Sequence, residues 1–327
     1  MQGKITAYIE LARPSHWIKN VFVFFPLVFA MRVGSLWAWG KAWQAMLAFC
    51  LASSAVYVFN DIADRKRDRE HPRKKDRPLA SGRIGVGRAI VEGVMFFVVA
   101  LAAALLLNIL VFGVVLAYLL LQLAYTFMLK QKMLVDVMCI ALGFVLRAVG
   151  GALAISVNIS PWLFVCVLTL CLFMGFCKRG NEIATLGDSG RAVSHRSTLQ
   201  GYTLSLLTHL ITLSAGLAIM SFLLYTLSPR TVKSFGTEYL IYTSPLVIYG
   251  ITRFAMLSME GKYSGPTQFV LRDWPIQVTV VLWLVAVLAI ILHGRAFQGW
   301  LHSLPAISEA RMPAPTACGE MMCLCLG

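Results

Sequence analysis

Three carboxylates follow one another at helical spacing. Asp61, Asp64 and Asp68 stand at positions i, i+3 and i+7, directly after the apolar stretch 42–60, and Asn60 precedes them. On a helix that continues out of this stretch, the spacing predicts that all three carboxylates project from one face. Carboxylates on one face repel each other unless a cation lies among them, and oxygen ligands favour Mg²⁺ or Mn²⁺. The sequence therefore predicts a divalent-metal site formed by Asp61, Asp64 and Asp68, to which Asn60 adds an amide oxygen.

Basic side chains follow these carboxylates. Lys74 and Arg77 lie in the same loop, just beyond Asp68. Arginine forms paired hydrogen bonds with phosphate, and lysine acts as a mobile point charge. A metal site followed by phosphate-binding cations is what a metal-bound diphosphate requires. The alternative is a set of surface salt bridges, which stabilise a protein little.

Two other segments bring polar side chains to membrane boundaries. Lys19 lies in the run Arg-Pro-Ser-His-Trp-Ile-Lys-Asn, which starts at Arg13 and leads into an apolar stretch; Lys178, Arg179 and Glu182 follow a later one. Lys19 serves either as a membrane anchor or as a phosphate contact. Lys178 and Glu182, four residues apart, either pair locally or contact a second phosphate or metal. We expect all four residues to help bind the substrate.

One cation lies inside an apolar stretch. Arg147 occupies the stretch 134–156, and a charge within a membrane span is costly enough to indicate a functional site. Asp136 lies about 16 Å away along the same helix, too far to pair with it. We expect Arg147 to face the interior of the bundle as a substrate-binding residue. Tyr125 and Lys130, at the end of the preceding stretch, either line the same cavity or anchor their helix.

The elements that must position these residues are apolar helices. The chain of 327 residues is 58% hydrophobic and 13% charged, whereas soluble proteins average about 45–50% apolar and about 25% charged residues. Apolar stretches of about 20 residues, the length that crosses a bilayer, recur at 20–38, 42–60, 88–107, 109–129, 134–156, 161–177, 203–227, 239–257 and 275–293. The sequence thus predicts an all-α, polytopic membrane bundle of about nine helices. A single domain is expected over 1–295, with a poorly ordered tail over 296–327.

The distribution of charge predicts the orientation. A net charge of +14 would suit nucleic acid, anionic lipid or an anionic substrate. Most of the 29 Lys and Arg residues fall on the side of the expected membrane that holds the N-terminus and the aspartate loop. Basic loops remain cytoplasmic, so the N-terminus and the site are expected in the cytoplasm and the chain in the cell membrane. No nucleic-acid partner is expected.

Together these motifs resemble those of a known family. The pattern Asn60-Asp61-x-x-Asp64-x-x-x-Asp68 after the second span resembles the first signature of the UbiA superfamily of membrane prenyltransferases. Further motifs are similar to its decaprenyl-phosphate phosphoribosyltransferase branch: Arg13-Pro-x-x-Trp17-x-Lys19-Asn20, His71-Pro-x-Lys74-x-x-Arg77-Pro-x-Ala-Ser-Gly82, Gly143-Phe-Val-Leu-Arg147-Ala, Lys178-Arg179-x-x-Glu182 and Leu271-Arg272-Asp273. The resemblance extends over residues 13–273, and its motifs are specific only in combination.

The resemblance implies a UbiA-like fold and a reaction. The donor would be phosphoribosyl pyrophosphate and the acceptor a polyprenyl phosphate, in a Mg²⁺-dependent pentosyl transfer for cell-envelope polysaccharide precursors at a bacterial inner membrane. Lys74, Arg77 and the aspartates would hold the diphosphate; Lys19, Lys178 and Arg179 would hold the remaining phosphates. The chain departs from the wider superfamily because it lacks a second Asp-x-x-x-Asp motif, which disfavours ordinary prenyl transfer to an aromatic acceptor.

Two alternatives stay open at this stage. The first is a UbiA-type prenyltransferase with a prenyl diphosphate donor and an aromatic or lipid acceptor. The second is an anion transporter, which the net charge and Arg147 would also suit, although a transporter has no need for carboxylates on one helix face. A lipid-extractable product from labelled phosphoribosyl pyrophosphate and polyprenyl phosphate would distinguish all three.

Overall fold

The computed structural model describes residues 2–70, 74–158, 160–187, 201–260 and 272–303. All the regular elements in these ranges are helices, as the sequence predicts. Seven helices are long and apolar enough to cross a membrane, spanning Leu36–Glu70, Val86–Leu105, Ile109–Leu129, Val135–Ala154, Pro161–Ile183, Leu204–Leu227 and Tyr239–Met259 among the described residues. The bundle therefore has close to the expected number of spans.

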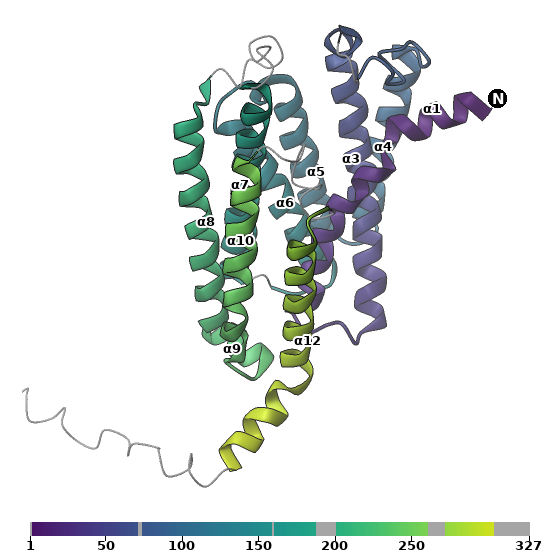
Figure 1. Ribbon diagram of the computed structural model, residues 1–327. Helices are drawn as coiled ribbons and strands as arrows, with labels where there is room; N and C mark the ends of the chain where they lie inside the picture. The colour runs from purple at the N-terminus through teal and green to yellow at the C-terminus, as the bar shows by residue number, and fades with distance from the viewer. Residues whose placement is uncertain (1, 71–73, 159, 188–200, 261–271, 304–327) are drawn as a thin grey trace, which may run out of the picture.

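These spans correspond to labelled elements in Figure 1. They are α3 (Leu36–Glu70), α4 (Val86–Leu105), α5 (Ile109–Ala124) with the π-helix η2 (Tyr125–Leu129), α6 (Val135–Ala154), α7 (Pro161–Gly187), α8 (Leu204–Leu227) and η4 (Tyr239–Thr243) with α10 (Ser244–Met259). The short helix α9 (Pro229–Phe235) follows α8. The last helix, α12 (Trp274–Ser303), extends past the boundary expected at residue 295. The rest of the expected tail, 304–327, lies outside the described residues.

The expected span over 20–38 does not form one continuous helix. The N-terminal helix α1 (Gln2–Ala12) leads into a 3₁₀-helix, η1 (Pro14–Phe24), and then into α2 (Phe25–Phe29). The chain turns after α2, where Met31 has a φ of 56°, and α3 starts only at Leu36. Proline at the start of each short helix and the turn between them divide an apolar stretch that looks continuous in sequence.

Helix α3 carries the aspartates beyond the membrane. Its 35 residues give a length of about 53 Å, whereas the hydrocarbon core of a bilayer is about 30 Å thick. The apolar part ends at Phe59, so the charged part from Asp61 to Glu70 projects as a helical extension. An uninterrupted helix thus fixes the directions of the three carboxylates relative to the bundle.

Small residues allow the helices to pack closely. One core lies among α3, α4 and α5 and includes Phe49, Tyr118 and the alanines Ala45, Ala48, Ala52, Ala55, Ala100 and Ala104. A second core lies among α7, α8 and α10 around Phe173 and Phe254. Figure 1 shows these two groups side by side, with α6 between them. Small side chains let helix backbones approach in lipid, where no hydrophobic force drives association.

The charged loops meet at one end of this bundle. Lys130, just after η2, contacts Asp64 near the end of α3. Asp136 at the start of α6 contacts Arg179 near the end of α7. These contacts bring together the ends of α3, α5 and α7 and the beginning of α6, while α9 lies at the opposite end (Figure 1).

Candidate active site

The segment η1 runs antiparallel along α3. The indole nitrogen of Trp17 donates to the Ser54 hydroxyl at 3.0 Å, and that hydroxyl donates to the carbonyl of Ala12 at 2.8 Å. The buried Asn20 amide donates to Ser53 at 3.3 Å. These bonds fix η1 against the half of α3 that leads to the aspartates.

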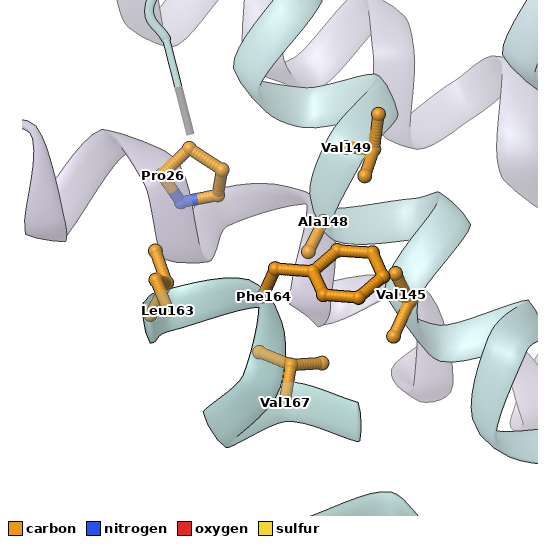
Figure 2. A pocket seen from close by; sticks show the side chains of 7 residues that line it. All are labelled: Pro26, Val145, Ala148, Val149, Leu163, Phe164 and Val167. Atoms are coloured by element: carbon orange, nitrogen blue, oxygen red, sulfur yellow. The ribbon is translucent and has the colours of Figure 1, made fainter. Parts of the chain in front are cut away.

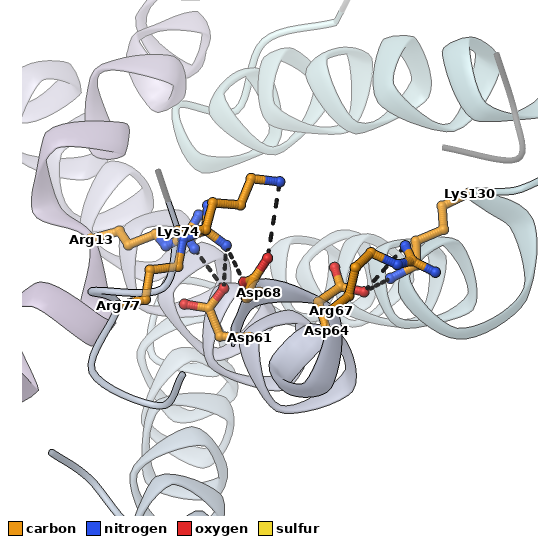
Figure 3. A network of polar contacts seen from close by, with 8 residues as sticks. All are labelled: Arg13, Asp61, Asp64, Arg67, Asp68, Lys74, Arg77 and Lys130. Carbon is orange, nitrogen blue, oxygen red and sulfur yellow. Dashed lines mark hydrogen bonds and ion pairs between the residues drawn. The ribbon is translucent and has the colours of Figure 1, made fainter. Parts of the chain in front are cut away.

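Asp61 and Asp68 share one guanidinium. Nη1 of Arg77 lies 3.3 Å from an oxygen of Asp61 and 2.6 Å from an oxygen of Asp68 (Figure 3). Arg13 lies 2.5 Å from Asp61, and Lys74 lies 4.0 Å from Asp68. Both carboxylates are buried. Asp61 and Asp68, two of the three acids predicted to hold a metal, therefore both contact the guanidinium of Arg77.

Asp64 points elsewhere. Its carboxylate lies 2.7 Å from Nζ of Lys130 and 3.9 Å from Arg67, apart from the other two carboxylates in Figure 3. A residue seven positions on returns to within about 20° of the first direction around a helix, but one three positions on is about 60° away. Of the three carboxylates expected to form one cluster, the structure places Asp61 and Asp68 together at Arg77 and Asp64 beside Lys130.

The π-helix brings Lys130 to Asp64. The amide of Lys130 donates to the carbonyl of Tyr125 at 2.9 Å, five residues back. A π-helical turn is wide and rare, and such turns are frequent at functional sites. Tyr125 lies on this turn and is half-buried beside Arg179. Tyr125 and Lys130, expected either to line the cavity or to anchor their helix, therefore lie at the polar site.

The loop that carries Arg77 folds back on α3. Nε of Arg65 donates to the carbonyl of Leu79 at 3.3 Å, and Nε of Arg69 donates to that of Ala80 at 3.1 Å. Leu79 is fully buried. Gly82 closes the loop with a φ of 81°. This backbone conformation is unfavourable for any residue that has a side chain. The position of Arg77 is therefore determined by its own loop.

The residues fit a divalent metal that needs only one or two protein ligands. Among the described residues, no three His, Cys, Asp or Glu side chains are placed to hold one ion. Mg²⁺, however, usually takes one or two carboxylates and completes its shell with water and substrate phosphates. Asp61 and Asp68, which already face a shared cation, meet that requirement. Asn60 is half-buried beside Asp61.

Arg147 lies inside the bundle, as expected. Its guanidinium donates to Asn20 at 2.6 Å, to the carbonyl of Gly143 at 2.8 Å and to the Tyr118 hydroxyl at 2.8 Å. Gly151 allows η1 to approach α6 closely, because a Cβ at this position would lie only 2.0 Å from the carbonyl oxygen of Val23 in η1. Arg147 thereby joins η1 to α6, and the three groups to which it donates are all neutral.

Lys19 lies close to Arg147 without a counter-ion. The described residues provide it with no hydrogen bond or ion pair. Burial, then the charges of Arg147 and Arg13, lower the pKa of Lys19. Lys19 and Arg147, to which the described residues supply no carboxylate, form a site for an anion.

The Lys178–Glu182 segment is more buried than expected. Arg179 is fully buried, with Nε 3.0 Å from Asp136, and it pairs with Glu182. The Tyr202 hydroxyl donates to Asp136 at 3.0 Å. Lys178 is 43% exposed and lies 4.0 Å from Glu182. Arg179 therefore holds Glu182 in place, whereas Lys178 stays open to solvent.

A small apolar pocket lies deeper in the bundle. It is lined by side chains of α2, α6 and α7, among them Pro26, Val145 and Phe164 (Figure 2). Its volume of about 10 Å³ is close to the minimum that one water needs. It is a gap in the packing and contributes no polar group.

Sequence reasoning missed two residues beside the aspartates. Arg13 has a left-handed backbone conformation, with a φ of 51°, which costs a non-glycine residue about 1–2 kcal/mol. This turn directs its guanidinium to Asp61. His16, one 3₁₀ turn later, packs against Tyr57. Both lie in the Arg-Pro-Ser-His-Trp-Ile-Lys-Asn run, and the 3₁₀ spacing of three residues per turn places them on the same side of η1 as Lys19.

Comparison with known proteins identifies the family. Residues 21–271 match the UbiA prenyltransferase family. The chain belongs to this family. It is 30% identical to the decaprenyl-phosphate phosphoribosyltransferase of Mycobacterium tuberculosis, over 89% of this chain and 96% of that protein. It is 31% identical to the protein of the same name from Corynebacterium glutamicum, over 85% of each.

Solved structures agree with the fold. A UbiA homologue from Archaeoglobus fulgidus, bound to GPP and Mg²⁺, superposes with a TM-score of 0.64 and 18% identity, covering 87% of this chain and 99% of that one. The same homologue has also been solved with Cd²⁺. The helical architecture of the UbiA family is therefore present in this chain.

Proposed function

We propose that this UbiA-family protein transfers 5-phosphoribose from phosphoribosyl pyrophosphate to a polyprenyl phosphate and releases pyrophosphate. The observation that carries the proposal is the division of the cations into two groups. Arg77 and Lys74 lie with Asp61 and Asp68, whereas Lys19 lies with Arg147 and has no carboxylate partner among the described residues. A prenyl diphosphate has phosphate at one end only, and would leave the second group without a ligand. The names of the two bacterial relatives support the same reading.

The diphosphate end is assigned to Asp61, Asp68, Lys74 and Arg77. A divalent metal held by the two carboxylates would neutralise the charge that develops on the departing pyrophosphate. Arg77 would then turn from the carboxylates to the diphosphate oxygens, for which its planar donor group is suited. Arg13 keeps Asp61 oriented during this exchange because its contact at 2.5 Å does not involve Arg77.

The acceptor phosphate is assigned to Lys19, with Arg147 beneath it. A phosphate oxygen of the polyprenyl phosphate attacks C1 of the ribose as the bond from C1 to the diphosphate oxygen breaks. The bonding electrons leave with pyrophosphate. A phosphate monoester has its second pKa at about 6, so the nucleophile is already ionised near neutral pH. No strong general base is required.

The remaining polar residues are given supporting roles. Lys178, which is open to solvent, is assigned to the 5-phosphate of the donor. Arg179 and Glu182 position the end of α7, on which Lys178 lies. Lys130 and Tyr125 on the π-helical turn orient Asp64, which serves as a further metal or water ligand. The whole site is proposed to face the cytoplasm of a bacterial inner membrane, where the soluble donor is available.

One assay tests the proposal. Purified full-length protein in lipid nanodiscs is given labelled phosphoribosyl pyrophosphate, Mg²⁺ and polyprenyl phosphate, and the lipid extract is measured for label. We expect a labelled lipid that requires both substrates. Transfer of a prenyl group from prenyl diphosphate to an aromatic acid, with no use of phosphoribosyl pyrophosphate, would replace this proposal with ordinary prenyl transfer.

A further inference from the structure

The helix η1 presents two rows of side chains. A 3₁₀-helix has about three residues per turn, so side chains three apart lie above one another. Trp17, Asn20 and Val23 form the first row, which packs on α3 and α6. Arg13, at the N-cap, begins a second row that continues with His16 and Lys19. The first and last of these approach the carboxylates and Arg147, and His16 lies between them.

His16 is held against Tyr57 of α3. Its ring centroid lies 5.1 Å from that of Tyr57, whose ring also contacts the Arg13 guanidinium at 5.2 Å. Tyr57 precedes Asp61 by one turn of α3. The imidazole is half-buried and is thus fixed next to the groups assigned to the diphosphate.

Positive charges surround His16 from three segments. Burial, then the charges of Lys19, Arg13, Arg77 and Lys178, lower the pKa of His16 to about 4. These cations belong to η1, to the loop after α3 and to α7. The imidazole is therefore neutral at physiological pH, although it lies in a site for anions. A neutral imidazole carries one hydrogen-bond donor and one acceptor.

His16 offers this site an uncharged hydrogen-bond acceptor. Arginine and lysine only donate hydrogen bonds. Asp61 and Asp68 accept them, but their negative charge repels phosphate, and one oxygen of each is bound to Arg13 or Arg77. A sugar between phosphate groups presents hydroxyls, each of which needs an acceptor. His16 provides one without adding negative charge.

We propose that His16 accepts a hydrogen bond from a ribose hydroxyl of the donor and so selects a sugar diphosphate over a prenyl diphosphate. This inference rests on the proposed phosphoribosyl transfer and names a residue that determines its specificity. A site built to bond a substrate hydroxyl discriminates strongly against an analogue that lacks it. Loss of one hydrogen bond that leaves a buried partner unpaired corresponds to a decrease in kcat/KM of about tenfold to hundredfold.

The test compares donors that differ by one hydroxyl. Wild type, His16→Gln and His16→Leu are assayed as full-length proteins with phosphoribosyl pyrophosphate and with its 2-deoxy and 3-deoxy analogues. We expect wild type to prefer the natural donor over one analogue by about tenfold to hundredfold in kcat/KM. His16→Leu should lose this preference chiefly by losing activity toward the natural donor. His16→Gln, which keeps a neutral acceptor, should retain most of the preference for the natural donor.

The outcomes separate this inference from the proposed function. If wild type uses phosphoribosyl pyrophosphate but His16→Leu loses activity equally toward all three donors, His16 is only structural and the inference is overturned. An unchanged preference in His16→Leu would overturn it as well. If wild type uses no phosphoribosyl donor, the proposed function falls and the inference with it. Ser15→Ala, an exposed neighbour on η1, is the control and should behave as wild type.

Discussion

Arg77 offers the sharpest test of the diphosphate assignment. It is the one residue in Figure 3 that contacts both Asp61 and Asp68, and its side chain is 28% exposed. Arg77→Gln removes the charge and keeps a polar group of similar reach. A hydrogen bond to a charged group contributes about 1.5–3 kcal/mol, and each 1.4 kcal/mol is about a factor of ten. We therefore expect the KM for phosphoribosyl pyrophosphate to rise about tenfold to hundredfold.

The same variant should act differently on the metal. In the structure, Arg77 competes for the carboxylates that would hold Mg²⁺, so its loss should lower the Mg²⁺ concentration required for half-maximal activity. Arg83→Gln is the matched control, because Arg83 lies in the same loop and contacts Glu10 and the carbonyl of Asp76. Initial rates over a grid of donor and Mg²⁺ concentrations measure both effects. An Arg77→Gln enzyme with an unchanged KM for the donor would refute the assignment.

Three further predictions concern metal, stability and orientation. Asp61→Asn and Asp68→Asn should each abolish turnover and also the rise in melting temperature that Mg²⁺ with pyrophosphate gives wild type; persistence of that rise would show that the pair holds no metal. The folded protein binds a proton at His16 more weakly than the unfolded chain, because its pKa is lowered to about 4. Wild type should therefore lose stability relative to His16→Gln as the pH falls from about 7 to about 5, and a difference in melting temperature that does not change with pH would contradict this. Single cysteines at exposed positions 83 and 233 should be labelled from opposite sides of the membrane, the first from the cytoplasm; labelling of both from one side would refute the topology.

The sequence predicts the membrane helices well because apolar stretches are a local property. The expected spans 88–107 and 203–227 lie within a few residues of α4 and α8. Arg147 was also expected inside the bundle, because a charge in an apolar helix has few other stable places. Spacing alone predicts all three carboxylates on one face of the helix. In the structure Asp61 and Asp68 share Arg77, whereas Asp64 contacts Lys130.

Features that depend on distant contacts were not predictable. Asp64 turns to Lys130 because a π-helical turn in another helix brings that lysine near. Arg179 is buried because Asp136, far away in sequence, meets it between α6 and α7. The close approach of η1 to α6 depends on Gly151, whose missing side chain admits the carbonyl of Val23. None of these partners can be identified from the local sequence around Asp64, Arg179 or η1.

The helix η1 connects the two halves of the proposed site, and this has a measurable consequence. Lys19 lies six positions after Arg13, which shares Asp61 with Arg77. At about 2.0 Å per residue the two ends of the site are about 12 Å apart along the helix axis. Effects of substitutions more than about 7–10 Å apart usually add. Lys19→Met should therefore raise the KM for the polyprenyl phosphate and leave that for the donor nearly unchanged, the reverse of Arg77→Gln. In the double variant the two losses in free energy should sum. A large coupling would mean that both cations hold the same phosphate, and the separation into donor and acceptor ends would be wrong.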